Sequence, residues 1–149
     1  MDNLDRIRYY ENRINRMDSN RNKLALREIQ TLDIICRISS INTSPQSALD
    51  LGCGDKFLEH PLRQRSVAYT GLDIKDCDLD NEDLPFEDNS FDMIISLAVI
   101  EHLANPIRVV TNCHRVLSPG GILYVITPNW KMDYLNFYDD YTHVSPFTP

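Results

Sequence analysis

The feature that most constrains the fold is a short apolar run that ends in two closely spaced glycines. Residues Ala48–Leu51 lead directly into Gly52-Cys53-Gly54, a pattern typical of a buried parallel strand that enters a tight turn before a helix. The next apolar run ends at Asp73. An acidic side chain at the tip of a second strand can bind both hydroxyls of a ribose. Together the two segments predict a site for a nucleoside cofactor.

Length and composition limit the class of protein. A chain of 149 residues, 42% hydrophobic and 25% charged, fits a single globular domain with its own core. The net charge of −7 argues against nucleic acid or an acidic membrane as a partner. The four cysteines lack metal-binding spacing, and neither a signal-peptide core nor a membrane-length apolar run is present. We therefore expect free thiols and a cytoplasmic location.

Three regions are expected along the chain. Residues 1–41 should form N-terminal helices, because apolar residues recur at helical spacing, with a break at Ser19-Asn20. Residues 45–130 should form a cofactor-binding α/β core, and 131–149 an irregular tail. Because strands alternate with helices in the core, we predict a Rossmann-like, doubly wound and mostly parallel sheet.

Five strands are expected in this core, at Ser47–Cys53, Val67–Ile74, a stub near Cys77–Asp80, Phe91–Val99 and Ile122–Thr127. A helix should begin at Asn105-Pro106, an N-cap followed by proline in the first turn, and should end before Ser118-Pro119-Gly120-Gly121. Only a short helix fits between the first two strands, because Pro61 lies there.

Five motifs in a fixed order carry a family resemblance. They are LDLGCG at 49–54, GLDI at 71–74, DNEDLPFEDNSFDMIIS at 80–96, IEHL at 100–103 and RVLSPGGILYVITPN at 115–129. The series resembles the class I S-adenosylmethionine-dependent methyltransferases, in particular methyltransferase type 11. Each motif alone is weak, whereas five in order at these separations are specific. The resemblance implies methyl transfer from S-adenosylmethionine to a small-molecule or glycan-type acceptor.

The resemblance also implies roles for individual residues. Gly52 and Gly54 would let the backbone pass under the methionine moiety, and Asp50 would help to orient its ammonium group. Asp73 would accept the ribose hydroxyls. The remaining implied cofactor contacts are Ile74, Asp80 at the adenine amino group, the Asn81 backbone N–H at the ring, and Leu97 near the sulfonium.

Two departures from the family pattern keep a second function open. Lys56 stands where the family usually has a third glycine, and the sequence supplies at most five of the usual seven strands. The alternative is a methyltransferase-like domain without activity that serves as a structural or protein-binding module. With no later strand to pair with, Ile122–Thr127 would form an open sheet edge, for which we expect a protein partner or self-association.

Catalytic and metal sites are weakly marked. His102 and His143 are candidates for a general base, and a structural hydrogen bond is an equal alternative for each. The spacing of Asp76, Asp78, Asp80 and Glu87 imitates a calcium loop, but Asn81 replaces the required glycine, so we predict no metal site. A dinucleotide oxidoreductase is disfavoured because Phe57 occupies the last glycine position of G-x-G-x-x-G.

Overall fold

The computed structural model describes residues 3–16, 21–41 and 44–149. Two helices precede the sheet, α1 (Asn3–Arg16) and α2 (Arg21–Ile38), as the apolar spacing predicts. The break predicted at Ser19-Asn20 lies outside the described residues. No helix within the described ranges is both long and apolar enough to cross a membrane.

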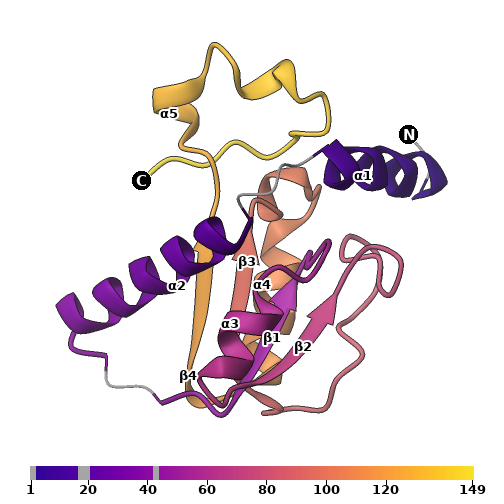
Figure 1. Ribbon diagram of the computed structural model, residues 1–149. Helices are drawn as coiled ribbons and strands as arrows, with labels where there is room; N and C mark the ends of the chain where they lie inside the picture. Colours follow the sequence, from indigo (N-terminus) through magenta and orange to yellow (C-terminus); the bar gives the residue numbers. More distant parts are fainter. Residues whose placement is uncertain (1–2, 17–20, 42–43) are drawn as a thin grey trace.

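A four-stranded parallel sheet forms the centre of the molecule (Figure 1). Its strands are β1 (Ser47–Leu51), β2 (Ala68–Leu72), β3 (Phe91–Leu97) and β4 (Leu117–Ile126), in the spatial order β2-β1-β3-β4. The chain crosses back between consecutive parallel strands, so their carboxyl ends share one edge. The predicted Rossmann-like α/β architecture is confirmed.

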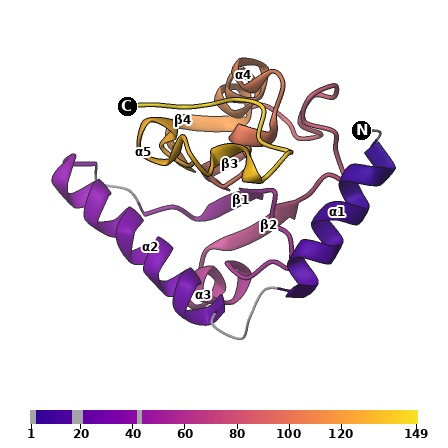
Figure 2. The same ribbon diagram turned by 90° about the horizontal axis from the view of Figure 1, so that it is seen from above.

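Helices cover both faces of the sheet. Figure 2 shows α4 (Pro106–Val116) on one side and α3 (Glu59–Gln64) with α2 on the other. Each face has its own apolar cluster, one including residues of α2 and α3 and the other including residues of α4. The centre of β3 is buried on both faces, with Met93, Ile94 and Ile95 at most 3% exposed, as expected for a central parallel strand.

The predicted strand stub at Cys77–Asp80 is wrong. This segment consists of successive turns, in which the Cys77 N–H donates to the Asp73 carbonyl at 3.1 Å and the Glu82 N–H donates to the Asp78 carbonyl at 2.7 Å. The Asp78 side chain accepts from the Asp80 N–H at 3.1 Å. Local bonds of this kind satisfy the backbone without a neighbouring strand, since aspartate favours such turns.

The junction between α4 and β4 is tighter than predicted. The helix begins at the predicted N-cap, where the Asn105 side chain accepts from the Arg108 N–H at 3.2 Å. The strand begins at Leu117, five residues before the predicted start at Ile122, because the Ser118–Gly121 segment forms a bulge within it. Leu117 pairs with Phe91 and Ile122 with Met93. Gly120, at φ +82°, supplies the left-handed conformation that the bulge requires.

The tail crosses the carboxyl ends of β3 and β4 and approaches α1 (Figure 1). It contains α5 (Trp130–Asp133), the short helix η2 (Phe137–Asp139) and one bridge between Asn129 and Phe147. Among the described strands, β4 pairs with β3 alone. The tail therefore covers the end of the sheet and does not extend its ladder.

Candidate functional site

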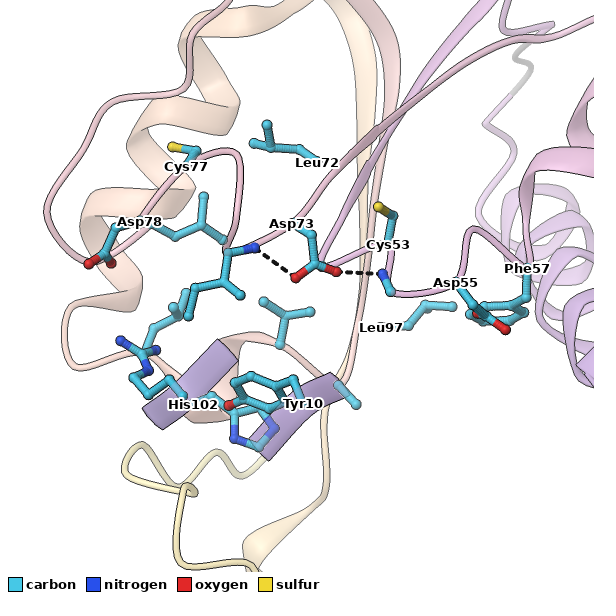
Figure 3. A pocket seen from close by; sticks show the side chains of 18 of the residues that line it. Tyr10, Cys53, Asp55, Phe57, Leu72, Asp73, Cys77, Asp78, Leu97 and His102 are labelled. Atoms are coloured by element: carbon cyan, nitrogen blue, oxygen red, sulfur yellow. Dashed lines mark hydrogen bonds between the residues drawn. The ribbon is translucent and has the colours of Figure 1, made fainter. Parts of the chain in front are cut away.

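An open cavity of about 200 Å³ lies at the carboxyl edge of the sheet (Figure 3). Five of the residues predicted to bind the cofactor line it, namely Gly52, Gly54, Asp73, Ile74 and Leu97. They come from the ends of β1, β2 and β3 or the turns that follow. Ligands of open α/β sheets bind outside the carboxyl ends of the strands, so the cavity occupies the expected place.

The glycine turn after β1 is sterically required. Gly52 adopts φ +70°, and a Cβ atom built on it would lie 2.4 Å from the Val99 Cγ2 atom. Its N–H donates to the Leu72 carbonyl at 2.8 Å. A side chain at Gly52 would therefore strain the backbone and displace Val99 in the turn after β3, which also lines the cavity.

The Asp73 carboxylate is anchored by two backbone N–H groups beside the cavity. Its Oδ2 atom accepts from the Gly54 N–H at 2.6 Å and its Oδ1 atom from the Ile74 N–H at 2.7 Å. Figure 3 shows these two bonds on either side of the carboxylate. Each oxygen has a further lone pair, so Asp73 can accept from two ligand hydroxyls while it stays anchored.

Asp50 does not line the cavity. It is 2% exposed, and its Oδ2 atom accepts from the Tyr69 hydroxyl at 2.8 Å. Burial raises the pKa of the Asp50 carboxyl to about 7, with the Tyr69 hydrogen bond opposing the shift and the nearby Asp73 charge adding to it. The structure thus places Asp50 beneath the glycine turn as a group that holds its proton into the neutral range.

Asp80 and Asn81 also lie off the cavity wall. The Asp80 Oδ1 atom accepts from the N–H groups of Ala104 and Asn105 at 2.8 and 3.3 Å, and Oδ2 forms an ion pair with Arg6 at 3.3 Å. Asp80 therefore connects the turn segment to the start of α4 and to α1. The segment's lining residues are instead Cys77, Asp78 and Leu79.

Lys56 is exposed and does not line the cavity. It adopts φ +59°, a left-handed conformation that glycine adopts without strain. The structure thus gives a backbone reason for a third glycine at this position and places the lysine charge away from the cavity.

Sequence reasoning missed the contribution of the N-terminal helices to the cavity. Arg6 and Tyr10 of α1 line it, as does Arg21 at the start of α2. Arg21 forms an ion pair with Asp55 and lies 5.8 Å from the centre of the Phe57 ring, within range of a cation–π contact. The amphipathic pattern of α1 indicated which side is apolar, but not which part of the core that side covers.

The two candidate histidines come together at one end of the cavity. His102, in the short helix η1 (Ile100–His102), lines it, and the centre of its ring lies 4.7 Å from that of His143 in the tail. Tyr10 packs edge-on against His102 at 5.5 Å, as Figure 3 shows. Sequence positions 102 and 143 gave no sign of this pairing, because the tail lacks a periodic pattern.

The comparisons with known proteins agree with this geometry. A family model described as a methyltransferase domain matches residues 49–125, more than half of the chain. The chain belongs to the methyltransferase domain family. The match begins within β1 and ends within β4, and hence includes both the glycine turn and Asp73. The predicted class I methyltransferase family is confirmed.

The curated relatives are distant and longer. The ubiquinone biosynthesis O-methyltransferase of Pseudomonas aeruginosa is 28% identical over 104 residues, which cover 56% of this chain and 45% of that protein. The corresponding Dechloromonas aromatica enzyme is 27% identical, over 75% of this chain and 57% of that protein. The chain thus spans about half the length of the curated relatives it matches.

Solved structures show the same fold at low identity. An S-adenosylmethionine-dependent methyltransferase from Archaeoglobus fulgidus matches with a TM-score of 0.61 and 20% identity, covering 87% of this chain and 63% of that one. One from Aquifex aeolicus matches with a TM-score of 0.57 and 14% identity, covering 85% of each chain. These likenesses support the methyltransferase fold of the domain.

Proposed function

We propose that this domain binds S-adenosylmethionine and transfers its methyl group to a small-molecule or glycan-type acceptor. The observation that carries the proposal is the anchored Asp73 carboxylate, held beside the glycine turn in a cavity at the carboxyl edge of a methyltransferase-family sheet. When bound, the cofactor supplies a methyl group on a positively charged sulfur, from which the acceptor takes it.

The residues around the cavity fit such a ligand. Asp73 would accept hydrogen bonds from the two ribose hydroxyls, as its remaining lone pairs allow. The turn at Gly52 and Gly54 brings the backbone close to the methionine moiety, because neither residue has a side chain to hold it away. The apolar side chains of Ile74, Leu79 and Leu97 also line the cavity; Ile74 and Leu79 would pack against the nucleoside, and Leu97 would shield the methyl group from water.

Asp50 acts from below the cavity. Its carboxyl stays partly protonated near neutral pH because burial raises its pKa to about 7. The ammonium group of the methionine moiety would favour the ionised form of Asp50, since opposite charges stabilise each other in a buried setting. Cofactor binding should therefore release a proton from Asp50 near pH 7.

His102 is placed to act on the acceptor. It lines the same cavity as Leu97, and an imidazole can take the proton of an acceptor hydroxyl or amine in methyl transfer. The rest of the catalysis rests on alignment of the two reactants. The names of the curated relatives, O-methyltransferases of ubiquinone biosynthesis, favour oxygen as the acceptor atom.

Calorimetric titration with S-adenosylhomocysteine tests the proposal. The unmodified domain should bind with micromolar-range affinity, and Asp73→Ala should weaken binding by about 1.5–3 kcal/mol through the loss of charged hydrogen bonds. Asp139→Ala, which removes an exposed carboxylate from the tail, is the matched control and should bind normally. Absence of binding at millimolar ligand would refute the proposal and favour a structural or protein-binding module.

A further inference from the structure

Three side chains with metal-ligand chemistry meet beside the cavity. One ligand atom each from Glu101, His102 and His143 lies within 4.8 Å of the others. Glu101 is fully buried and the His143 side chain is 11% exposed. The first two residues belong to η1 and the third to the tail, so the chain brings them together from segments about 40 residues apart.

The hydrogen bond of His143 fixes its tautomer. Its Nδ1 atom lies 2.6 Å from the Phe137 carbonyl oxygen. A carbonyl oxygen can only accept, so Nδ1 carries the hydrogen and donates it. In the neutral ring, the lone pair is then on Nε2.

The same reasoning applies to His102 through Thr142. The Thr142 hydroxyl lies 2.5 Å from the Asp140 Oδ1 atom and 2.9 Å from the His102 Nδ1 atom. An ionised carboxylate only accepts, so the single hydroxyl hydrogen goes to Asp140. Thr142 therefore accepts from His102, whose Nδ1 atom carries the hydrogen and whose Nε2 atom carries the lone pair.

Glu101 also has a hydrogen-bond partner, on a residue outside the group of three. Its Oε2 atom accepts from the Thr127 hydroxyl at 3.0 Å. Thus a hydrogen bond on one side orients each of the three side chains: Glu101 accepts from Thr127, His102 donates to Thr142, and His143 donates to the Phe137 carbonyl. Histidines that bind metals almost always donate their other N–H to a carbonyl or polar group, and ligating carboxylates are likewise hydrogen-bonded.

We propose that Glu101, His102 and His143 form a binding site for a divalent transition-metal ion, Zn²⁺ or Mn²⁺. Two imidazoles and one carboxylate suit these ions, whereas Mg²⁺ and Ca²⁺ prefer oxygen ligands. Bonds of about 2.1 Å at tetrahedral angles place ligand atoms about 3.4 Å apart. The three ligand atoms already lie within 4.8 Å of one another, so binding would need only a small approach of the side chains.

The role of the ion rests on the proposed methyl transfer. Because His102 lines the cavity, an ion bound there would have an open coordination position toward the acceptor. With the ion on its Nε2 atom, His102 would hold the ion and would no longer act as the base. An acceptor hydroxyl bound to the ion would instead lose its proton to water more readily, because the positive charge lowers the hydroxyl pKa. The oxygen keeps the electron pair that would form the bond to the methyl carbon, while the carbon–sulfur bond breaks and its electron pair returns to the sulfur, which becomes a neutral thioether. The site thus indicates a hydroxyl-bearing acceptor.

The test is a calorimetric titration of the metal-stripped full chain with Zn²⁺ and, separately, Mn²⁺, without cofactor. We expect one site per chain, weakened at least 100-fold by His143→Ala. Thr142→Val, which removes the partner of His102, should weaken it 10–100-fold, the usual effect of losing an outer partner. His60→Ala and His114→Ala alter exposed histidines and should leave binding unchanged. All titrations use the Cys36→Ser background, because this partly exposed thiol could bind Zn²⁺.

Several results would overturn the metal site. No binding by the parent chain at millimolar metal would leave the three residues as a hydrogen-bonded clasp between tail and core. Binding that survives His143→Ala, with circular dichroism showing an intact fold, would place the metal elsewhere. The S-adenosylhomocysteine titration is independent, so a domain that binds cofactor and no metal keeps the proposed function and loses only this inference.

Discussion

Asp50 should make the stability of this domain fall as pH rises toward neutrality. Burial raises the pKa of its carboxyl from 3.8 to about 7 in the folded protein, while in the unfolded chain an aspartate titrates near 3.9. The folded state therefore binds the proton more tightly. A group whose folded pKa is raised contributes stability that is fully present below the unfolded pKa and is lost as pH rises through the folded pKa. The window is thus about pH 4 to 7.

The magnitude follows from the size of the shift. A rise of about 3 pKa units corresponds to about 4 kcal/mol of folding free energy lost across this window, at about 1.4 kcal/mol per unit. The carboxyl is 2% exposed, so solvent screens little of this effect. Asp50→Asn keeps an oxygen that accepts from the Tyr69 hydroxyl and removes the ionisation. It should therefore match the parent near pH 4 and exceed its stability by up to about 4 kcal/mol near pH 8.

Urea denaturation at a series of pH values measures this directly. The useful quantity is the difference between variant and parent at each pH, because other groups titrate equally in both. Asp139→Asn, on the exposed tail, controls for the loss of a carboxylate as such. A difference between Asp50→Asn and parent that stays constant from about pH 4 to 8 would refute the reasoning, since the protonation of Asp50 would then not be coupled to folding.

Two further predictions concern Lys56 and the sheet edge. Lys56→Gly should relieve the left-handed strain at φ +59° and raise stability by about 1 kcal/mol or less, since glycine's chain entropy offsets part of the gain. Because the lysine is exposed and off the cavity, S-adenosylhomocysteine affinity should not change, and tenfold tighter binding would contradict this placement. The open edge of β4 should cause the 149-residue chain to self-associate or bind a partner, as measured by light scattering with hydrogen exchange. A monodisperse monomer whose Ile122–Thr127 amides are strongly protected would contradict it.

The sheet was predictable because its signals are local and agree with each other. Apolar runs flanked by polar and turn-forming residues place β1, β2 and β3 within two residues of their observed ends. The start of β4 was misplaced because Ser118–Gly121 reads as a loop in sequence. The segment is a bulge within β4, which pairs with β3 both before and after it. Only this pairing distinguishes a bulge from a loop.

The cavity was predictable where backbone conformation determines it. Gly52, Gly54 and Asp73 line it as expected, since a strand, a tight turn and a second strand fix their positions. Asp80 was different, because its carboxylate is occupied by the start of α4 and by Arg6. A sequence motif does not indicate which of several neighbouring carboxylates will form an ion pair or hydrogen bond with a helix that is distant in sequence. The same limitation hid the contact between His102 and His143.

The attachment of the tail has a consequence for the order in which the molecule assembles. The Val144 and Ser145 N–H groups donate to the Glu101 carbonyl at 2.8 and 3.0 Å, and the Ser145 hydroxyl donates to the Leu103 carbonyl at 2.6 Å. Closing the roughly 20-residue segment from the end of β4 costs about 2–3 kcal/mol of chain entropy, which these bonds and the buried Phe137 ring offset. The sheet can form without the tail, whereas the tail cannot dock until η1 exists. We therefore expect the segment that carries His143 to open locally while the sheet, with the glycine turn and Asp73, remains intact.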